Sequence, residues 1–340
     1  IRAGCMHYFG YPITPQTEIA AYMAKRMPKI GGVFLQAESE IAAVNMVLGV
    51  AATGKRVMTS SSSPGVSLKQ EGISFIAASE LPALVINVMR GGPGLGTIHP
   101  SQADYFQAVK GGGHGDYRLI VLAPSSVQEM ADFVALGFDL AFKYRTPSMI
   151  IADGIIRQMM EKVILPPYRP RRTNDEIRQQ CPWATLGKPD NRERNVTTSL
   201  ALEAEEMERT NLRLQAKYKE ICENEVRFEA VNCDDADFVL IAFGSIARVC
   251  MSAMEIGRKE GLKIGVLRPI TLYPFPTLKI QELAKKAKGI LTVELSAGQM
   301  VEDVRLAVNG SIPVEFYGRM GGVVPTPEEV LEQLKKQLVK

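Results

Sequence analysis

The sequence predicts an α/β protein with a parallel sheet in its first half and a second, smaller α/β domain in its last third. Short apolar runs alternate with helical periodicity up to about residue 165, and the same alternation resumes at residue 237. Strands joined through helices form right-handed βαβ crossovers, which make the strands parallel. A proline-rich, polar stretch separates the two alternating regions. We therefore divide the chain into a first domain at 1–165, a linker with a charged helix at 166–232 and a second domain at 233–340.

In the first domain, Thr14 followed by Pro15 predicts a helix start, with a hydroxyl N-cap and proline at the first helical position. The following helix is expected to extend to about Met27, because apolar residues recur there at helical spacing. The other helices are expected at 38–52, 67–79 and 127–144. The expected strands, each a short apolar run, are 6–9, 31–36, 56–59, 81–89, 118–123 and 147–152.

The linker begins with several prolines and continues into a helix at 202–225 that is rich in Glu, Arg and Lys. This helix is expected either to be solvated or to pack on a partner protein. The second domain is expected to have strands at 238–243, 263–267, 289–294 and 314–317. Its helices are expected at 244–261, 278–287, 300–308 and 327–338. The last of these is amphipathic, and its first turn carries Glu328 and Glu329, as the helix dipole favours.

Composition excludes several classes of protein. The chain has 340 residues, 46% hydrophobic and 23% charged, which is ordinary for a soluble globular protein. A net charge of +3 gives no reason to expect nucleic-acid binding. No apolar run approaches the roughly 20 residues of a membrane span. No signal peptide is visible. An odd number of scattered cysteines with 15 methionines leads us to expect a cytoplasmic protein.

The cysteines and histidines argue against a metal centre on this chain. The five cysteines are scattered, with no CxxC pair, and suit a reducing cytoplasm rather than an iron–sulfur cluster or a zinc site. With only three histidines, a histidine-based metal site is not expected either. Three enzyme fingerprints are also absent: the G-x-G-x-x-G of nucleotide binding, the P-loop and the G-x-S-x-G of esterases.

The stretch from Arg90 to Asp116 is the most distinctive feature, since it holds eight of the 29 glycines and follows an apolar strand directly. Open α/β sheets bind ligands at the carboxyl ends of their strands. Arg90 at this junction can form a forked interaction with a carboxylate or phosphate. A plain surface loop is the alternative, but ordinary connections have only about four to six residues. His99 and His114 are further candidates for lining a site here.

Four loops at strand ends are expected to meet at one edge of the first sheet: 11–14, 36–40, 59–65 and the loop that begins at Arg90. Together they offer a hydroxyl, a carboxylate, a run of serines and a guanidinium. This set suits a small acid held by Arg90 and Thr14, with Glu40 nearby for proton chemistry. The alternative for Glu40 is a helix N-terminal residue that the helix dipole favours.

Several of these segments resemble the α-type subunit of the 2-oxoacid:ferredoxin oxidoreductases, and the likeness covers nearly the whole chain. The segments are YPITP (11–15), ESEIAA (38–43), TSSSSPG (59–65), RGGP (90–93), RPITLYPFP (268–276) and LSAGQM (295–300). The resemblance is closest to the branched-chain enzyme, which acts on 2-oxoisovalerate (3-methyl-2-oxobutanoate), and next to the 2-oxoglutarate enzyme. It implies a pyrimidine-binding (PYR-type) domain at 1–165 and a transketolase C-terminal-like domain at 233–340.

The resemblance also implies roles for individual residues. Glu40 would bond N1′ of the aminopyrimidine of thiamine diphosphate, and a proton shared in a dry pocket would favour the imino form that removes the thiazolium C2 proton. Thr14 and Arg90 would bind the substrate carboxylate and oxo group. Ser62, Pro64 and Gly65 would line the cofactor, in a turn where Ser63 replaces a glycine of other members.

The implied reaction is the oxidative decarboxylation of a 2-oxoacid to acyl-coenzyme A, with electrons passed to ferredoxin. This chain has no Gly-Asp-Gly for a diphosphate–Mg²⁺ site and no CxxC. The Mg²⁺, the diphosphate end and the iron–sulfur clusters are therefore expected on partners: a thiamine-diphosphate/iron–sulfur beta-type subunit and gamma-type and ferredoxin-like subunits. We expect a homodimerised hetero-oligomer that uses an external ferredoxin, and an isolated chain that is inactive.

Three alternatives stay open from the sequence. The enzyme could be specific for 2-oxoglutarate or pyruvate. It could be a transketolase- or dehydrogenase-type thiamine subunit that does not use ferredoxin, which a CxxC- and Gly-Asp-Gly-bearing partner chain would argue against. It could also be a non-catalytic binding protein that keeps the fold, but the joint presence of Thr14, Glu40 and Arg90 argues against this.

Overall fold

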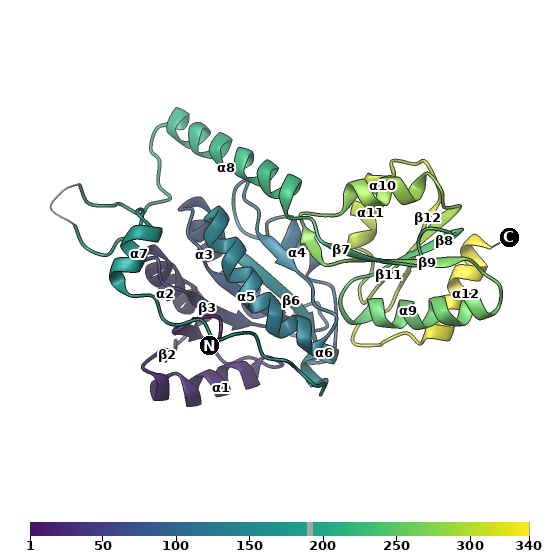
Figure 1. Cartoon of the computed structure of the whole chain (residues 1–340), viewed down its shortest axis with the longest axis horizontal. Coiled ribbons are helices and arrows are strands. Elements are labelled where there is room, and N and C mark those ends of the chain that lie inside the picture. The colour runs from purple at the N-terminus through teal and green to yellow at the C-terminus, as the bar shows by residue number, and fades with distance from the viewer. Residues whose placement is uncertain (189–192, 340) are drawn as a thin grey trace.

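The computed structural model describes residues 1–188 and 193–339 and contains two sheets in two domains (Figure 1). The seven-stranded sheet of the first domain has the order β10-β5-β6-β4-β3-β1-β2. Its strands are β1 (His7–Gly10), β2 (Val33–Gln36), β3 (Val57–Ser61), β4 (Leu84–Met89), β5 (Ile120–Leu122), β6 (Ser148–Asp153) and β10 (Thr271–Tyr273). All pairings are parallel except that of β10 with β5. The prediction of a parallel sheet is therefore confirmed.

Helices cover both faces of this sheet. They are α1 (Thr17–Arg26), α2 (Glu40–Ala52), α3 (Ser63–Ala78), α4 (Tyr105–Val109), α5 (Val127–Tyr144) and α6 (Gly154–Gln158), with a short 3-10 turn at Pro28–Ile30. Alternate residues of the buried β4 strand separate the two faces, as strand geometry requires. Val85 joins the core under α2 and α3, whereas Leu84 and Ile86 join the core under α1 and α5.

The predicted helix start at Thr14 is wrong. Helix α1 begins at Thr17, and Gln16 is its N-cap without a side-chain capping bond. The Thr14–Pro15 peptide is cis, and a turn in which the N–H of Gln16 donates to the carbonyl of Ile13 precedes the helix. The buried Gln16 side chain accepts a hydrogen bond from Ser60 on β3, so this segment is fixed to the sheet rather than built into the helix.

The second domain contains a five-stranded sheet of order β12-β11-β8-β9-β7. Its strands are β7 (Phe228–Val231), β8 (Phe238–Ile241), β9 (Ile264–Pro269), β11 (Gly289–Glu294) and β12 (Val314–Gly318). Its helices are α9 (Gly244–Lys259), α10 (Thr277–Ala284), α11 (Met300–Val308) and α12 (Pro327–Leu338). β7 is antiparallel to β9, and the other pairs are parallel. Helices α9 and α12 share one core, whereas α10 and α11 join the core that extends into the first domain.

The segment between the alternating regions is partly structured on the first domain. It contains α7 (Asn174–Gln180) and the long α8 (Ala204–Asn224), which lies along the first domain in Figure 1. One face of α8 is buried, with Leu214, Tyr218 and Ile221 packed on β5 and α5. The charged helix is thus neither fully solvated nor free for a partner on that face. Among residues 1–188 and 193–339, no helix is long and apolar enough to cross a membrane.

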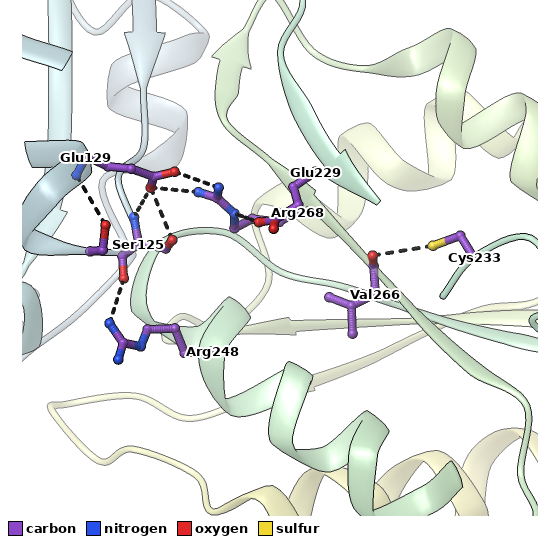
Figure 2. Close-up of polar contacts among 8 residues, drawn as sticks. Ser125, Glu129, Glu229, Cys233, Arg248, Val266 and Arg268 are labelled. Carbon is purple, nitrogen blue, oxygen red and sulfur yellow. Dashed lines mark hydrogen bonds and ion pairs between the residues drawn. The ribbon is translucent and has the colours of Figure 1, made fainter. Parts of the chain in front are cut away.

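One strand crosses between the two domains. β7, which sequence analysis did not expect, lies in the second sheet although it follows α8 closely, and β10 leaves the second domain to form an edge of the first sheet. Figure 2 shows the buried Arg268, at the end of β9, between two carboxylates. Its guanidinium forms a bidentate pair with Glu129 of α5, at 2.7 and 2.9 Å, and its Nε donates to Glu229 at 2.9 Å. This ion pair and a continuous core join the domains.

Candidate active site

Glu40 lies at the carboxyl edge of the first sheet, as the first residue of α2. Ser39 is the N-cap, and its hydroxyl accepts a hydrogen bond from the N–H of Ala42. The Glu40 side chain is buried, with the residue 5% exposed. Within residues 1–188 and 193–339, no group donates a hydrogen bond to its carboxylate. A buried carboxylate normally has a donor, so this one is poised to receive a proton-bearing group from outside the chain.

Gly65 packs closely against the Glu40 carboxylate. A Cβ at this position would lie 2.5 Å from Glu40 Oε1 and still closer to Ser61 Oγ, so no side chain fits there. Gly65 lies in the first turn of α3, next to Pro64, which the helix accepts near its start. Glycine is therefore required by close packing.

The run from Ser60 to Ser63 at the end of β3 divides into bonded and unbonded hydroxyls. Ser60 is bonded to Tyr8 and Gln16, and Ser63 donates to Asp104 at 2.6 Å. In the described part of the chain, the buried hydroxyls of Ser61 and Ser62 have no hydrogen-bond partner. Each buried unsatisfied polar group costs about 1–3 kcal/mol, so two successive ones at the end of β3, with Ser61 close to Gly65 and Glu40, indicate a place where a polar ligand binds.

Arg90 follows β4 and is only 7% exposed. Its Nη1 donates to the carbonyl of Thr14 at 2.7 Å and its Nη2 to the carbonyl of Leu95 at 3.0 Å. Its buried Nε has no partner among the described residues. The structure thus brings Arg90 and Thr14 together, but through the Thr14 backbone; the Thr14 residue itself is exposed.

Asp104 and Asn87 also lie at this edge of the first sheet, and sequence analysis did not predict them as site residues. Asp104, in the glycine-rich stretch, accepts hydrogen bonds from Ser63 Oγ and from Asn87 Nδ2 of β4, at 2.6 and 2.8 Å. Burial raises the pKa of the Asp104 carboxyl. The Asn87 amide oxygen in turn accepts from the Ser63 N–H. The available signal was the single polar Asn87 within the apolar run LVINVM.

A cavity of about 710 Å³ lies beside Arg90, between the two domains. It is lined by Ser63, Arg90, Asp104 and the first glycines of the loop on one side, and by Ser296, Gln299 and Met320 of the second domain on the other. The candidate residues His99 and His114 are exposed and do not line it. Among the described residues, no group of three or more His, Cys, Asp or Glu side chains could hold a metal ion.

Comparison with known proteins places this geometry in a family. Residues 1–225 match the family model described as "Pyruvate flavodoxin/ferredoxin oxidoreductase, thiamine diphosphate-binding", and residues 236–330 match "Pyruvate:ferredoxin oxidoreductase core domain II". The chain belongs to the 2-oxoacid:ferredoxin oxidoreductases. The predicted resemblance to an alpha-type subunit of this family is confirmed, as is its thiamine-binding first domain.

Curated relatives of this oxidoreductase subunit span almost its full length. It is 52% identical over 336 residues to "Ketoisovalerate oxidoreductase subunit VorB" of Methanothermobacter thermautotrophicus, covering 98% of this chain and 93% of the relative. It is 36% identical over 357 residues to "2-oxoglutarate synthase subunit KorA" of the same organism, covering 99% and 95%. The predicted enzyme class, a ferredoxin-dependent 2-oxoacid oxidoreductase subunit, is confirmed.

Solved structures confirm the fold. A 2-oxoglutarate:ferredoxin oxidoreductase from Magnetococcus marinus, with 2-oxoglutarate, coenzyme A and succinyl-CoA bound, superposes with a TM-score of 0.84 at 28% identity. The match covers 98% of this chain and 62% of that one. A split-gene transketolase superposes with a TM-score of 0.59 at 15% identity over 97% of this chain and 90% of the other, which shows the fold alone.

Proposed function

We propose that this chain is the subunit that supplies the pyrimidine-binding half of the active site in an enzyme that oxidatively decarboxylates 2-oxoisovalerate. The observation that carries the proposal is the buried Glu40 carboxylate, which lacks a hydrogen-bond donor from the described chain and approaches Gly65 together with the unsatisfied hydroxyl of Ser61. The branched-chain substrate is supported by two relatives with about half of their residues identical, each named "Ketoisovalerate oxidoreductase subunit VorB".

The residues at this edge fit the aminopyrimidine of thiamine diphosphate. Glu40 would accept a proton-bearing ring nitrogen, which satisfies a carboxylate that otherwise has no donor. The hydroxyls of Ser61 and Ser62 would form hydrogen bonds with the polar ring substituents. Gly65 and Pro64 would contact the ring, and the absence of a side chain on Gly65 would leave room for it. When bound, thiamine diphosphate supplies the electron sink that a 2-oxoacid needs for loss of CO2. Glu40 would hold and release the proton shared with the ring.

Arg90 and Thr14 are proposed to contact the substrate. Two guanidinium nitrogens of Arg90 already bond to backbone carbonyls, which fixes the plane of the group. Its Nε is buried without a partner and would donate to the substrate carboxylate or oxo group. Thr14, held at the same point by its own carbonyl, would place its hydroxyl on the same substrate. Arg90 would thus act as a preorganised donor through Nε, rather than through a bidentate interaction of its two Nη atoms.

The rest of the site is proposed to lie on other subunits. The described residues contain no acidic cluster for Mg²⁺, and the sequence has no Gly-Asp-Gly and no CxxC. We assign the diphosphate–Mg²⁺ end and the iron–sulfur clusters to a beta-type subunit, with gamma-type and ferredoxin-like subunits in the same complex. Coenzyme A is the proposed acyl acceptor, an external ferredoxin the electron acceptor, and the cytoplasm the location.

The test is Glu40→Gln in the complex purified with its partner subunits. We expect normal assembly and a loss of at least about 100-fold in turnover, the usual contribution of a positioned acid–base group. Glu38→Gln is the matched control, because Glu38 is exposed two residues away. Assays of 2-oxoisovalerate, 2-oxoglutarate and pyruvate with a low-potential electron acceptor identify the substrate. Near-normal decarboxylation by Glu40→Gln would refute the role of Glu40, and a preference for 2-oxoglutarate or pyruvate would refute the substrate.

A further inference from the structure

Lys69 of α3 is fully buried, with 0% of the residue exposed, and lies next to Glu40. Its Nζ donates a hydrogen bond to the backbone carbonyl of Glu40 at 3.5 Å, and within residues 1–188 and 193–339 it has no carboxylate oxygen within 4.0 Å. Lysine is almost never fully buried unless it is paired with an opposite charge. The complete burial of Lys69 therefore requires a specific explanation, unlike the burial of an apolar core residue.

The packing of α2 against α3 prevents Lys69 from reaching solvent. Gly65 and Gly72 lie four residues before and three residues after Lys69, so the three share one face of α3. A Cβ on Gly65 would collide with Glu40, and a Cβ on Gly72 would lie 2.8 Å from Val44 Cγ2. The two helices are thus in close contact on both sides of Lys69. Because helical side chains lean toward the N-terminus of their helix, Lys69 extends toward Glu40.

Glu40 is the charged group that faces Lys69. Desolvation lowers the pKa of Lys69 to about 8, and attraction to the Glu40 charge opposes this shift. The other charged or titratable groups around α3 contact different residues of the helix: Asp104 and Arg90 contact Ser63, and the neutral phenol of Tyr117 donates to Gln70. Glu71 is exposed on α3 itself. β3 and β4 carry no charged residue within their bounds.

We propose that Lys69 is the positioning residue of Glu40, a buried counter-charge that holds the carboxylate over Gly65 and stabilises its negative charge while it shares a proton. Glu40 has no hydrogen-bond donor in the described chain, so charge attraction and packing are what fix it. The catalytic consequence rests on the proposed function of Glu40. The proximity of the two residues does not, because it depends only on residues of this chain.

The pair is tested first without activity, by a double-mutant cycle on the melting temperature of the full chain at pH 7. Lys69→Met and Glu40→Gln each leave one buried polar partner unmatched, so each lowers the melting temperature. The double variant melts above either single variant, because neither charge remains. Lys69→Met combined with Glu71→Gln is the matched control, in which the two shifts add. Additive shifts for Lys69 and Glu40 would overturn the proposal.

The second readout uses the assembled enzyme. Lys69→Met is expected to weaken the apparent affinity for thiamine diphosphate and to lower turnover by about tenfold, the change that one pKa unit of lost interaction represents. The wild-type rate should fall as pH rises above about 8, where Lys69 loses its proton, and this alkaline decline should be absent in Lys69→Met. An unchanged pH profile would overturn the catalytic part. Near-normal turnover of Glu40→Gln together with a non-additive cycle would instead refute the proposed function and leave the pair intact.

Discussion

Replacing Gly65 by alanine is the sharpest perturbation of the Glu40 site. The new Cβ would lie 2.5 Å from Glu40 Oε1, whereas ordinary contact begins at 3.4 Å, so the carboxylate must retreat by about 0.9 Å. A misplacement of about 1 Å in a catalytic group can cost about 100-fold in rate. Overpacking costs about 1–3 kcal/mol of stability, offset by roughly 0.5–1 kcal/mol that alanine gains over glycine within a helix.

The assay compares Gly65→Ala with Gly49→Ala, an exposed glycine of α2 whose added Cβ would meet nothing within 4 Å. Gly49→Ala should raise the melting temperature and leave turnover unchanged. Gly65→Ala should lower the melting temperature relative to Gly49→Ala and reduce turnover of the assembled enzyme by about 100-fold. If Gly65→Ala melts as high as Gly49→Ala and keeps full turnover, the close approach of Gly65 to Glu40 does not position the carboxylate.

Two further predictions concern stability. Arg268→Met removes the buried partner of Glu129 and Glu229 and should lower the unfolding free energy, measured with urea, by about 3 kcal/mol. Arg178→Met, which removes an exposed pair on α7, should change it by less than about 1 kcal/mol. Equal losses in the two variants would contradict the role of the interdomain pair. Folding lowers the pKa of Lys69 to about 8, so the unfolded chain binds more protons than the folded chain between pH 8 and 10.5. The unfolding free energy should therefore rise across this window by up to about 3 kcal/mol more in the wild type than in Lys69→Met. A parallel rise in both proteins would contradict the buried charge.

The fold class was predictable because hydrophobic periodicity is a local property. The runs that form β4 and β6 are mostly apolar and buried at every position, as is typical of strands covered on both faces. Strand pairing between distant segments is not local, and here prediction failed. Thr271–Tyr273 lies between prolines and was not among the expected strands, yet it pairs with β5 at the sheet edge, where flanking prolines are tolerated. The strand Phe228–Val231 was likewise hidden in the expected linker.

The candidate site was predictable in outline for a related reason. Loops that follow parallel strands must meet at one edge, so Glu40, Arg90 and the serine run could be grouped in advance. Which atoms face one another depends on packing, which spacing does not encode. The Thr14–Arg90 contact uses a backbone carbonyl, and the burial of Lys69 follows from the close approach of α2 and α3 at two glycines. Periodicity alone treats a lysine in a helix as a surface residue.

The passage of β10 into the first sheet limits how far the two domains can separate. β9 ends at Pro269 in the second sheet and β10 begins at Thr271 in the first, so at this crossing a single residue, Ile270, separates the two strands. Its carbonyl accepts a hydrogen bond from the N–H of Ala123. A hinge opening would have to pull β10 from β5 or β9 from β8. The walls of the cavity beside Arg90 therefore move as one unit. We therefore expect access to the proposed substrate site to depend on the glycine-rich loop or on neighbouring subunits rather than on separation of the two domains.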